Sequence, residues 1–293
     1  MFPSLKVLLS SIVDYAGLFP PAKLNLKEAI ANYAQYHQTR NNWLLGRFII
    51  PVSRLTELAM LLGDSSLGNN ITSKWSLSVI VSKDWESELK QIEAFGNKIG
   101  VASVEFKPLS PAEIKRAVNR LSNGIESFFE IPLSADLVKY LAVLQGTNGA
   151  AKIRTGGLIT QAFPDRDRLC QFIFASAAAQ VPFKATAGLH HLFPGKYAVS
   201  YEPNSFTTSM QGFLNLSILT ALVYWQKLTL QEALIVLQES SHSSFQFQND
   251  NIAWQDRRLS LAELPQARQH FFRSFGSCSF QEPVDELGEL QLL

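Results

Sequence analysis

The chain has 293 residues, of which 46% are hydrophobic and 17% are charged, and its formal net charge is +1. This length and composition exclude a disordered chain and suit one large barrel-type domain or two ordinary domains. A near-neutral chain without a basic stripe has no electrostatic reason to bind nucleic acid or an anionic membrane, so we expect a small-molecule partner.

Cysteine content and hydropathy also indicate the cellular location that we expect for the protein. The two cysteines, Cys170 and Cys278, lie far apart and form neither a disulfide framework nor a metal-type spacing. The first residues lack the features of a signal peptide, and the most apolar run, residues 212–225, is too short to cross a bilayer. We therefore expect a cytoplasmic protein without a membrane partner. The sequence leaves the oligomeric state open, a homo-oligomer included.

Short apolar runs alternate with amphipathic stretches through the first two thirds of the chain, at intervals of roughly 25 to 30 residues, as βα units do. Most runs are continuously apolar, which is typical of strands buried on both faces. Ser110 before Pro111 marks one helix start, and Pro164 with Asp165 marks another. The expected strands are residues 12–18, 47–51, 77–81, 101–106, 127–131, 151–154 and 182–185.

The last third of the chain departs from this alternation. Its pattern predicts helices over residues 210–226, 229–238 and 259–272, a small hairpin over 244–247 and 251–254, an eighth strand over 272–275 and a closing helix from 284. We predict a single α/β domain over residues 1–293, a (β/α)8 TIM-type barrel. A helical insertion between strands 7 and 8, about residues 190 to 270, is expected to lie as a lid over the carboxyl face.

Two lysines near the ends of consecutive predicted strands, Lys152 and Lys184, carry the clearest chemical signal. A buried lysine is tolerated if its charge is paired or if its neutral form is favoured, and a neutral amine is a nucleophile. Two lysines close together would favour each other's neutral form, which is a route to a Schiff-base enzyme. Because alternate residues of a strand point the same way, Arg154 should share the orientation of Lys152, and we expect both to face inward.

The segment from Lys152 to Gly156, Lys-Ile-Arg-Thr-Gly, resembles the Lys-x-x-Thr-Gly motif of the deoxyribose-phosphate aldolases, in which the lysine forms the Schiff base. Residues 183–188, which contain Lys184 and Gly188, are similar to that family's next strand, whose lysine assists the first. The resemblance implies a (β/α)8 barrel and class I chemistry, which needs neither a metal nor a cofactor.

Three further segments follow the same order as in that family. Residues 12–18, with Asp14, resemble its opening strand, and Glu105 falls where the family carries a catalytic aspartate. Residues 272–279 resemble its final strand and phosphate-binding turn. The chain also departs from the family, since Arg154 replaces a small residue, Leu-His-His at 189–191 replaces the residues after the family's glycines, and the insertion has no counterpart. These departures imply a different substrate, or a different reaction on the same scaffold.

Our leading hypothesis is a class I lyase, similar to an aldolase, acting on a small oxygenated carbonyl compound with or without a phosphate group. Lys152 would form the iminium, and Lys184, Asp14 and Glu105 would help to move protons. The expected binding residues are Arg154, Thr155, Gly156, Gly188, His190, His191, Glu130, Gly276, Ser277 and Ser279.

Two alternatives stay open at this point. In the first, His190, Glu105, Glu130 and Asp14 surround a divalent metal ion, and the lysines stabilise an oxyanion. In the second, the barrel is catalytically silent and its insertion binds a protein or a metabolite. The lysines would then be structural, paired with carboxylates inside the barrel, and Cys278 would be an ordinary turn residue.

Overall fold

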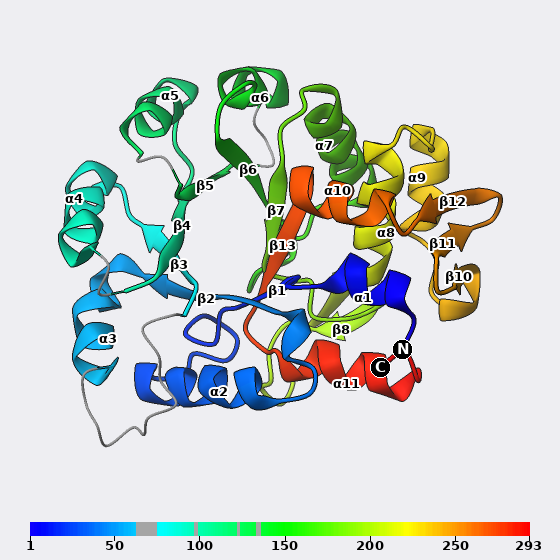
Figure 1. Cartoon of the computed structure of the whole chain (residues 1–293), viewed down its shortest axis with the longest axis horizontal. Helices are drawn as coiled ribbons and strands as arrows, with labels where there is room; N and C mark the ends of the chain where they lie inside the picture. Colours follow the sequence, from blue (N-terminus) through cyan, green and yellow to red (C-terminus); the bar gives the residue numbers. More distant parts are fainter. Residues whose placement is uncertain (63–74, 97–98, 122–123, 133–135) are drawn as a thin grey trace.

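The computed structural model describes residues 1–62, 75–96, 99–121, 124–132 and 136–293. Eight parallel strands close into a barrel in the order β1-β13-β7-β6-β5-β4-β3-β2, which confirms the predicted (β/α)8 architecture (Figure 1). The barrel strands are β1 (Val13–Tyr15), β2 (Leu45–Pro51), β3 (Leu77–Val81), β4 (Val101–Phe106), β5 (Glu126–Glu130), β6 (Gly149–Arg154), β7 (Phe183–Thr186) and β13 (Phe272–Ser277).

Helices surround the barrel, as Figure 1 shows. Apolar faces explain most of this layer, since an amphipathic helix buries one apolar stripe while its polar residues face water. The helices are α1 (Pro3–Leu9), α2 (Leu26–Gln38), α3 (Leu55–Leu62), α4 (Trp85–Phe95), α5 (Pro111–Arg120), α6 (Leu137–Leu144), α7 (Arg166–Ala178), α8 (Phe213–Tyr224), α9 (Leu230–Val236), α10 (Glu263–His270) and α11 (Gln281–Glu289). Single 3-10 turns lie at Asn42–Leu44, Val52–Arg54, Thr160–Ala162 and His242–Ser244.

Two of the predicted helix starts are confirmed in detail. The Ser110 hydroxyl accepts a hydrogen bond from the backbone N–H of Glu113, and the Glu113 carboxylate accepts one from the backbone N–H of Ser110. Thr229 and Glu232 form the same reciprocal capping box at the start of α9. Each box satisfies two backbone donors that a helix start would otherwise leave without partners.

The segment between β7 and β13 has more sheet than its sequence pattern predicts. Strands β8 (Gly195–Ala198) and β9 (Thr207–Met210) form an antiparallel hairpin that the sequence reading missed. The predicted hairpin is extended by a third strand, so β10 (Phe245–Phe247), β11 (Asn251–Trp254) and β12 (Arg257–Ser260) form one antiparallel sheet. Residues 257–260 therefore form a strand, where we expected the beginning of a helix.

The two parts of this segment pack in different places. Helix α8 is apolar all round and is buried among α7, α10 and β13, as an outer helix of the barrel. The small sheet contacts α1, the helix that precedes β1, through Phe2 against Phe247 and through Ser4, which donates a hydrogen bond to the carbonyl of Gln248. Residues 213–270 thus pack beside the barrel and toward its amino end. Within the described chain, no helix combines the length and the apolar character needed to cross a bilayer.

Candidate functional site

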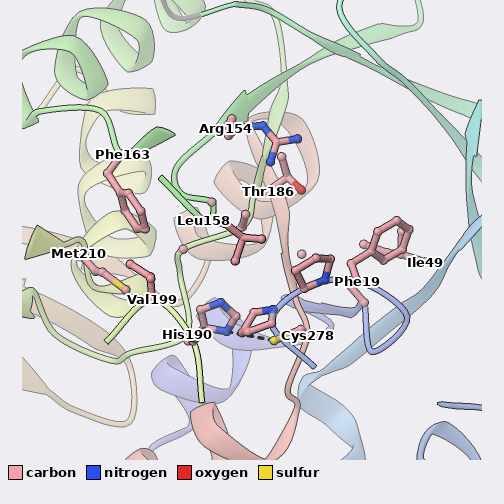
Figure 2. A pocket seen from close by; sticks show the side chains of 18 of the residues that line it. Phe19, Ile49, Arg154, Leu158, Phe163, Thr186, His190, Val199, Met210 and Cys278 are labelled. Atoms are coloured by element: carbon pink, nitrogen blue, oxygen red, sulfur yellow. Dashed lines mark hydrogen bonds between the residues drawn. The ribbon is translucent and has the colours of Figure 1, made fainter. Parts of the chain in front are cut away.

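A cavity of about 620 Å³ lies at the carboxyl ends of the barrel strands. Figure 2 shows Arg154 and Thr186 on one side of it and Phe163, Val199 and Met210 on another. The charged lining residues are Lys107, Glu130, Lys152, Arg154 and Glu282, and the large apolar ones are Phe19, Ile49, Ile80, Leu158, Phe163, Val199 and Met210. The cavity therefore suits a ligand with a charged or polar end and an apolar part.

Strand register brings the charged groups together. Glu130 of β5 aligns with Lys152 of β6, and Lys152 aligns with Lys184 of β7. The prediction that the two lysines lie on adjacent parallel strands is therefore confirmed. Arg154 also lies on the inner side, because its Nε donates to Glu130 Oε1 at 2.9 Å.

Glu105 lies between the two lysines. Its Oε2 accepts a hydrogen bond from Lys152 Nζ at 3.2 Å, and its Oε1 accepts one from Lys184 Nζ at 2.7 Å. The network extends from Lys152 to Glu130, 3.2 Å away, and from Lys184 to Asp14, 2.5 Å away. Three carboxylates and three cationic groups thus alternate across the barrel, which satisfies each buried charge by an opposite one.

The pairing sets the protonation states of the buried groups. Burial is the largest influence on Lys184 and favours its neutral amine, but attraction to Asp14 and Glu105 outweighs it and raises the pKa of Lys184 above its ordinary value. Burial likewise disfavours the carboxylate of Glu105, yet Lys184 and Lys152 hold the pKa of Glu105 well below its usual range. The pKa of Glu130 is lowered for the same reason, by Lys152 and Arg154 against the opposing effect of burial. Lys184 is therefore a fixed cation.

The expected catalytic residues divide into two groups by their access to the cavity. Lys152 lines the cavity, whereas Lys184, Glu105 and Asp14 do not. Asp14 is held from three sides, by Lys184, by the Ser274 hydroxyl at 2.6 Å and by the backbone N–H of Arg47 at 2.8 Å. Because Lys184, Glu105 and Asp14 do not line the cavity, any part that they take in proton movement has to pass through Lys152. Glu130, which we expected to bind substrate, is the network carboxylate that reaches the cavity.

Thr155, Gly156 and Gly188 join the loops after β6 and β7. The Thr155 hydroxyl donates to the carbonyl of Ala187, and a Cβ at Gly156 would lie 2.5 Å from the Cα of Gly188. Gly188 has a φ of +74°, and a Cβ there would lie 2.5 Å from the carbonyl oxygen of Thr155. The motif glycines allow the two loops to touch, and Gly188 lines the cavity, whereas Thr155 and Gly156, which we also expected to bind substrate, do not.

His190 and Cys278 meet at one side of the cavity (Figure 2). His190 Nδ1 lies 3.0 Å from Ser277 Oγ and 4.0 Å from Cys278 Sγ. Burial, together with the neighbouring His191, lowers the pKa of His190 to about 4, so its ring is neutral at pH 7. Burial raises the pKa of the Cys278 thiol to about 11. A neutral thiol is a poor nucleophile, so Cys278 fits the expected turn role.

The other expected binding residues differ in their surroundings. His191 Nδ1 contacts Glu286 Oε1 at 2.6 Å, and its ring stacks on Tyr197 while also lining the cavity. Gly276 lines the cavity, but the Ser277 hydroxyl donates to the carbonyl of Ser279, and neither serine is part of the lining.

An acidic residue weakens the expected phosphate site at this turn. Helix α11 begins at Gln281, earlier than predicted, and places Glu282 in its first turn. Glu282 lines the cavity and accepts a hydrogen bond from the Tyr201 hydroxyl at 2.7 Å. A carboxylate at a helix start competes with a bound anion, so Arg154 and Lys107 are the better anion partners here.

The sequence pattern did not indicate Tyr201 or the apolar wall, and it placed Lys107 at a strand end without a role in binding. Lys107 follows β4 directly, so its position at a strand end was a usable signal. Tyr201 comes from the loop between β8 and β9, and no local pattern marks it. The part of the predicted lid that lines the cavity is His190, His191, residues 197–201 and Met210, which belong to the β8–β9 hairpin and its flanks.

The metal alternative lacks a suitable set of ligands. Among the residues that the structure describes, no three or more His, Cys, Asp or Glu side chains are grouped as a metal site would require. Glu105 and Asp14 are already paired with lysines, while His190 faces Ser277 and Glu282. This geometry does not support the arrangement in which these residues share one ion.

The fold and the site together define a (β/α)8 barrel with a lysine at the wall of a carboxyl-end cavity and a second lysine behind it. No protein-family model, curated protein or solved structure matches the chain. The similarity to the deoxyribose-phosphate aldolases therefore rests on the short motifs and on the barrel itself.

Proposed function

We propose that this protein is a Schiff-base lyase of the aldolase type, acting on a carbonyl compound with an anionic end and an apolar part. The observation that carries the proposal is the position of Lys152, which lines the cavity, pairs with Glu105 and Glu130 and aligns with Lys184 on the next strand.

The charge balance of the network suits an iminium. The resting ammonium of Lys152 is paired with Glu105 and Glu130, and an iminium on the same nitrogen carries the same positive charge. The pairing that holds the ammonium would therefore also stabilise the iminium. Lys152 must first lose one proton to attack a carbonyl, and it lines the cavity through which that proton can leave.

The reaction can be written with its electrons and protons balanced. The neutral amine of Lys152 adds to the substrate carbonyl, and the resulting carbinolamine takes up the proton that Lys152 released and loses water to give the iminium. Glu130, a carboxylate at the cavity wall, removes the proton of the β-hydroxyl group. The bond between the α and β carbons then breaks, its electron pair passes into the iminium to form an enamine, and an aldehyde leaves. Protonation of the enamine and hydrolysis release the second product and restore Lys152.

The lining residues indicate the substrate class. Arg154 and Lys107 are cations at the cavity, and Arg154 retains 44% side-chain exposure although it pairs with Glu130. They would bind a carboxylate or a phosphate. Phe163, Val199 and Met210 form an apolar wall (Figure 2). A carbonyl compound with a hydrocarbon or aromatic part fits this wall better than a small sugar would.

Reductive trapping tests the proposal. The protein would be incubated with borohydride and a panel of carbonyl compounds, and intact mass and peptide mapping would locate the adduct. We expect a reduced adduct at Lys152, and none in Lys152→Arg, because a guanidinium keeps the charge but is not a nucleophile at neutral pH. Lys107→Arg is the matched control, since it changes a lysine of the same cavity and should still be trapped. Labelling of Lys107 alone, or of no lysine in the cavity, would contradict the proposal.

A catalytically silent, ligand-binding barrel is the second candidate. The observation in its favour is that both lysines are fully paired with carboxylates, as structural lysines are. Saturable binding of a carbonyl compound without trapping or turnover would favour this candidate over the lyase.

A further inference from the structure

A second cavity, of about 790 Å³, lies at the amino ends of the barrel strands, away from the site described above. Its wall comes from α1, from the starts of β2, β5 and β13, and from α10. The charged side chains that line it are Lys6, Asp14, Arg47, Glu126, Arg268 and Arg273. Four cationic groups therefore face two carboxylates.

The two carboxylates do not neutralise this cluster. Asp14 Oδ2 is held by Lys184 and Ser274, and its Oδ1 accepts the backbone N–H of Arg47. Glu126 is therefore shared by two guanidinium groups. It forms a close ion pair with Arg47, and its Oε1 lies 3.5 Å from Arg273 Nε. The cavity thus has an excess of positive charge.

Arg273 is the least satisfied of these groups. Its guanidinium makes no hydrogen bond to the part of the chain that the structure describes, and its Nε is buried without a hydrogen-bond partner. Burial is the largest influence that lowers the pKa of Arg273, and the nearby Arg47 adds to it against the attraction of Glu126. A buried donor without a partner is costly, so this arrangement favours an added anion.

Arg268 adds a further, half-buried cation. It donates to three carbonyls, those of Phe272, Arg273 and Ser10, while its Nε has no hydrogen-bond partner. Burial lowers the pKa of Arg268 to about 9, so the group stays charged at pH 7. Because it holds α10 against the start of β13, its positive charge is fixed beside the cavity.

We propose that this amino-end cavity is a binding site for a small phosphate-bearing metabolite, with Arg47 and Arg273 as the direct partners of the phosphate group. Guanidinium groups match phosphate oxygens in pairs, and a phosphate carries close to two negative charges at neutral pH. The excess of two positive charges in the lining matches that dianion better than a single carboxylate. The cavity is larger than phosphate alone requires, and Tyr33, His37 and Pro265 line the space left for an organic part.

Calorimetric titration of the full chain with orthophosphate and with pyrophosphate tests the site. We expect saturable binding of pyrophosphate that Arg273→Gln weakens by about tenfold or more, the effect of losing one charge-assisted contact of about 1.4 kcal/mol. Glu126→Gln should strengthen binding, because it removes the carboxylate that competes for Arg47 and Arg273. A structural role for Glu126 alone would not produce a gain in affinity.

The controls separate this site from the rest of the molecule. Arg120→Gln removes an exposed guanidinium that pairs with Glu93 and lies outside the cavity, and it should leave binding unchanged. Trapping at Lys152 should be the same in all three variants, so this inference does not rest on the proposed lyase function. Absence of saturable binding to the wild-type chain, or equal affinities in the wild type and Glu126→Gln, would overturn the proposal. The second criterion holds even if Arg273→Gln does not fold.

Discussion

The two ends of the barrel hold charge in different ways. At the carboxyl end, Lys152 and Lys184 alternate with carboxylates until every buried charge has an opposite partner. At the amino end, guanidinium groups outnumber the available carboxylates, and the guanidinium of Arg273 donates no hydrogen bond within the described residues. The comparison teaches that in a closed ion network the removal of one group leaves a buried charge without its partner, whereas an open network has positive charge to which an anion can be added.

The largest expected effect comes from breaking the closed network at its centre. Lys184→Met leaves Asp14 and Glu105 buried with one positive partner fewer, so we expect a loss of about 3 to 5 kcal/mol in the free energy of unfolding. Urea unfolding would measure it. Lys152→Met should cost less, because Lys152 and its partner Glu130 line the cavity, from which water can solvate the carboxylate left without its lysine. Equal losses of unfolding free energy in the two variants would contradict the conclusion that Lys184 lies deeper in the barrel than Lys152.

The second largest effect is expected from acid, which should weaken the ion network at the carboxyl end. The pKa values of Glu105 and Glu130 lie below their ordinary range in the folded protein, so the unfolded chain takes up protons first as the pH falls. Their contribution to stability is fully present above about pH 5 and is lost as the pH falls below about 4. Unfolding free energies between pH 7 and pH 3 would check this. A stability that stays flat below pH 4 would argue against ionised carboxylates in the core.

His190 should make the free energy of unfolding depend on pH in a second, milder pH range. Its folded pKa of about 4 lies below the usual value, so the unfolded chain binds the proton first and stability falls as the pH drops from about 6.5 to 4. The full shift corresponds to a loss on the order of 3 kcal/mol. We expect His190→Gln to flatten the slope in this window and to leave the steeper loss below pH 4 in place. An unchanged slope would mean that His190 is charged in the folded protein.

The smallest effect is expected at the open end. Arg47 and Glu126 are 21% and 29% exposed, so a double-mutant cycle should give a coupling of about 1 kcal/mol or less that shrinks with added salt. The exposed pair of Arg120 and Glu93 is the matched comparison at the surface. A coupling of several kcal/mol for Arg47 with Glu126 would show that this pair is as closed as the core network.

The sequence could predict local features because they depend on neighbouring residues. Apolar runs marked the eight barrel strands, and Ser110 and Thr229 marked helix starts that the structure confirms. Alternation along β6 correctly placed Lys152 and Arg154 on one side. The hairpin of β8 and β9 was missed, because its strands are short and half-exposed and have no continuous apolar run.

Thus the sequence by itself determined the alternation of strands and helices, the adjacent strands of the two lysines and the shared side of Lys152 and Arg154. Only the tertiary structure decided that Glu105 lies between the lysines, that Asp14 lies behind Lys184, and that Arg47, Glu126 and Arg273 meet at the amino end. The physical reason is barrel closure. The register between strands that are distant in sequence depends on how the whole sheet tilts and closes, and no local pattern of residues fixes it.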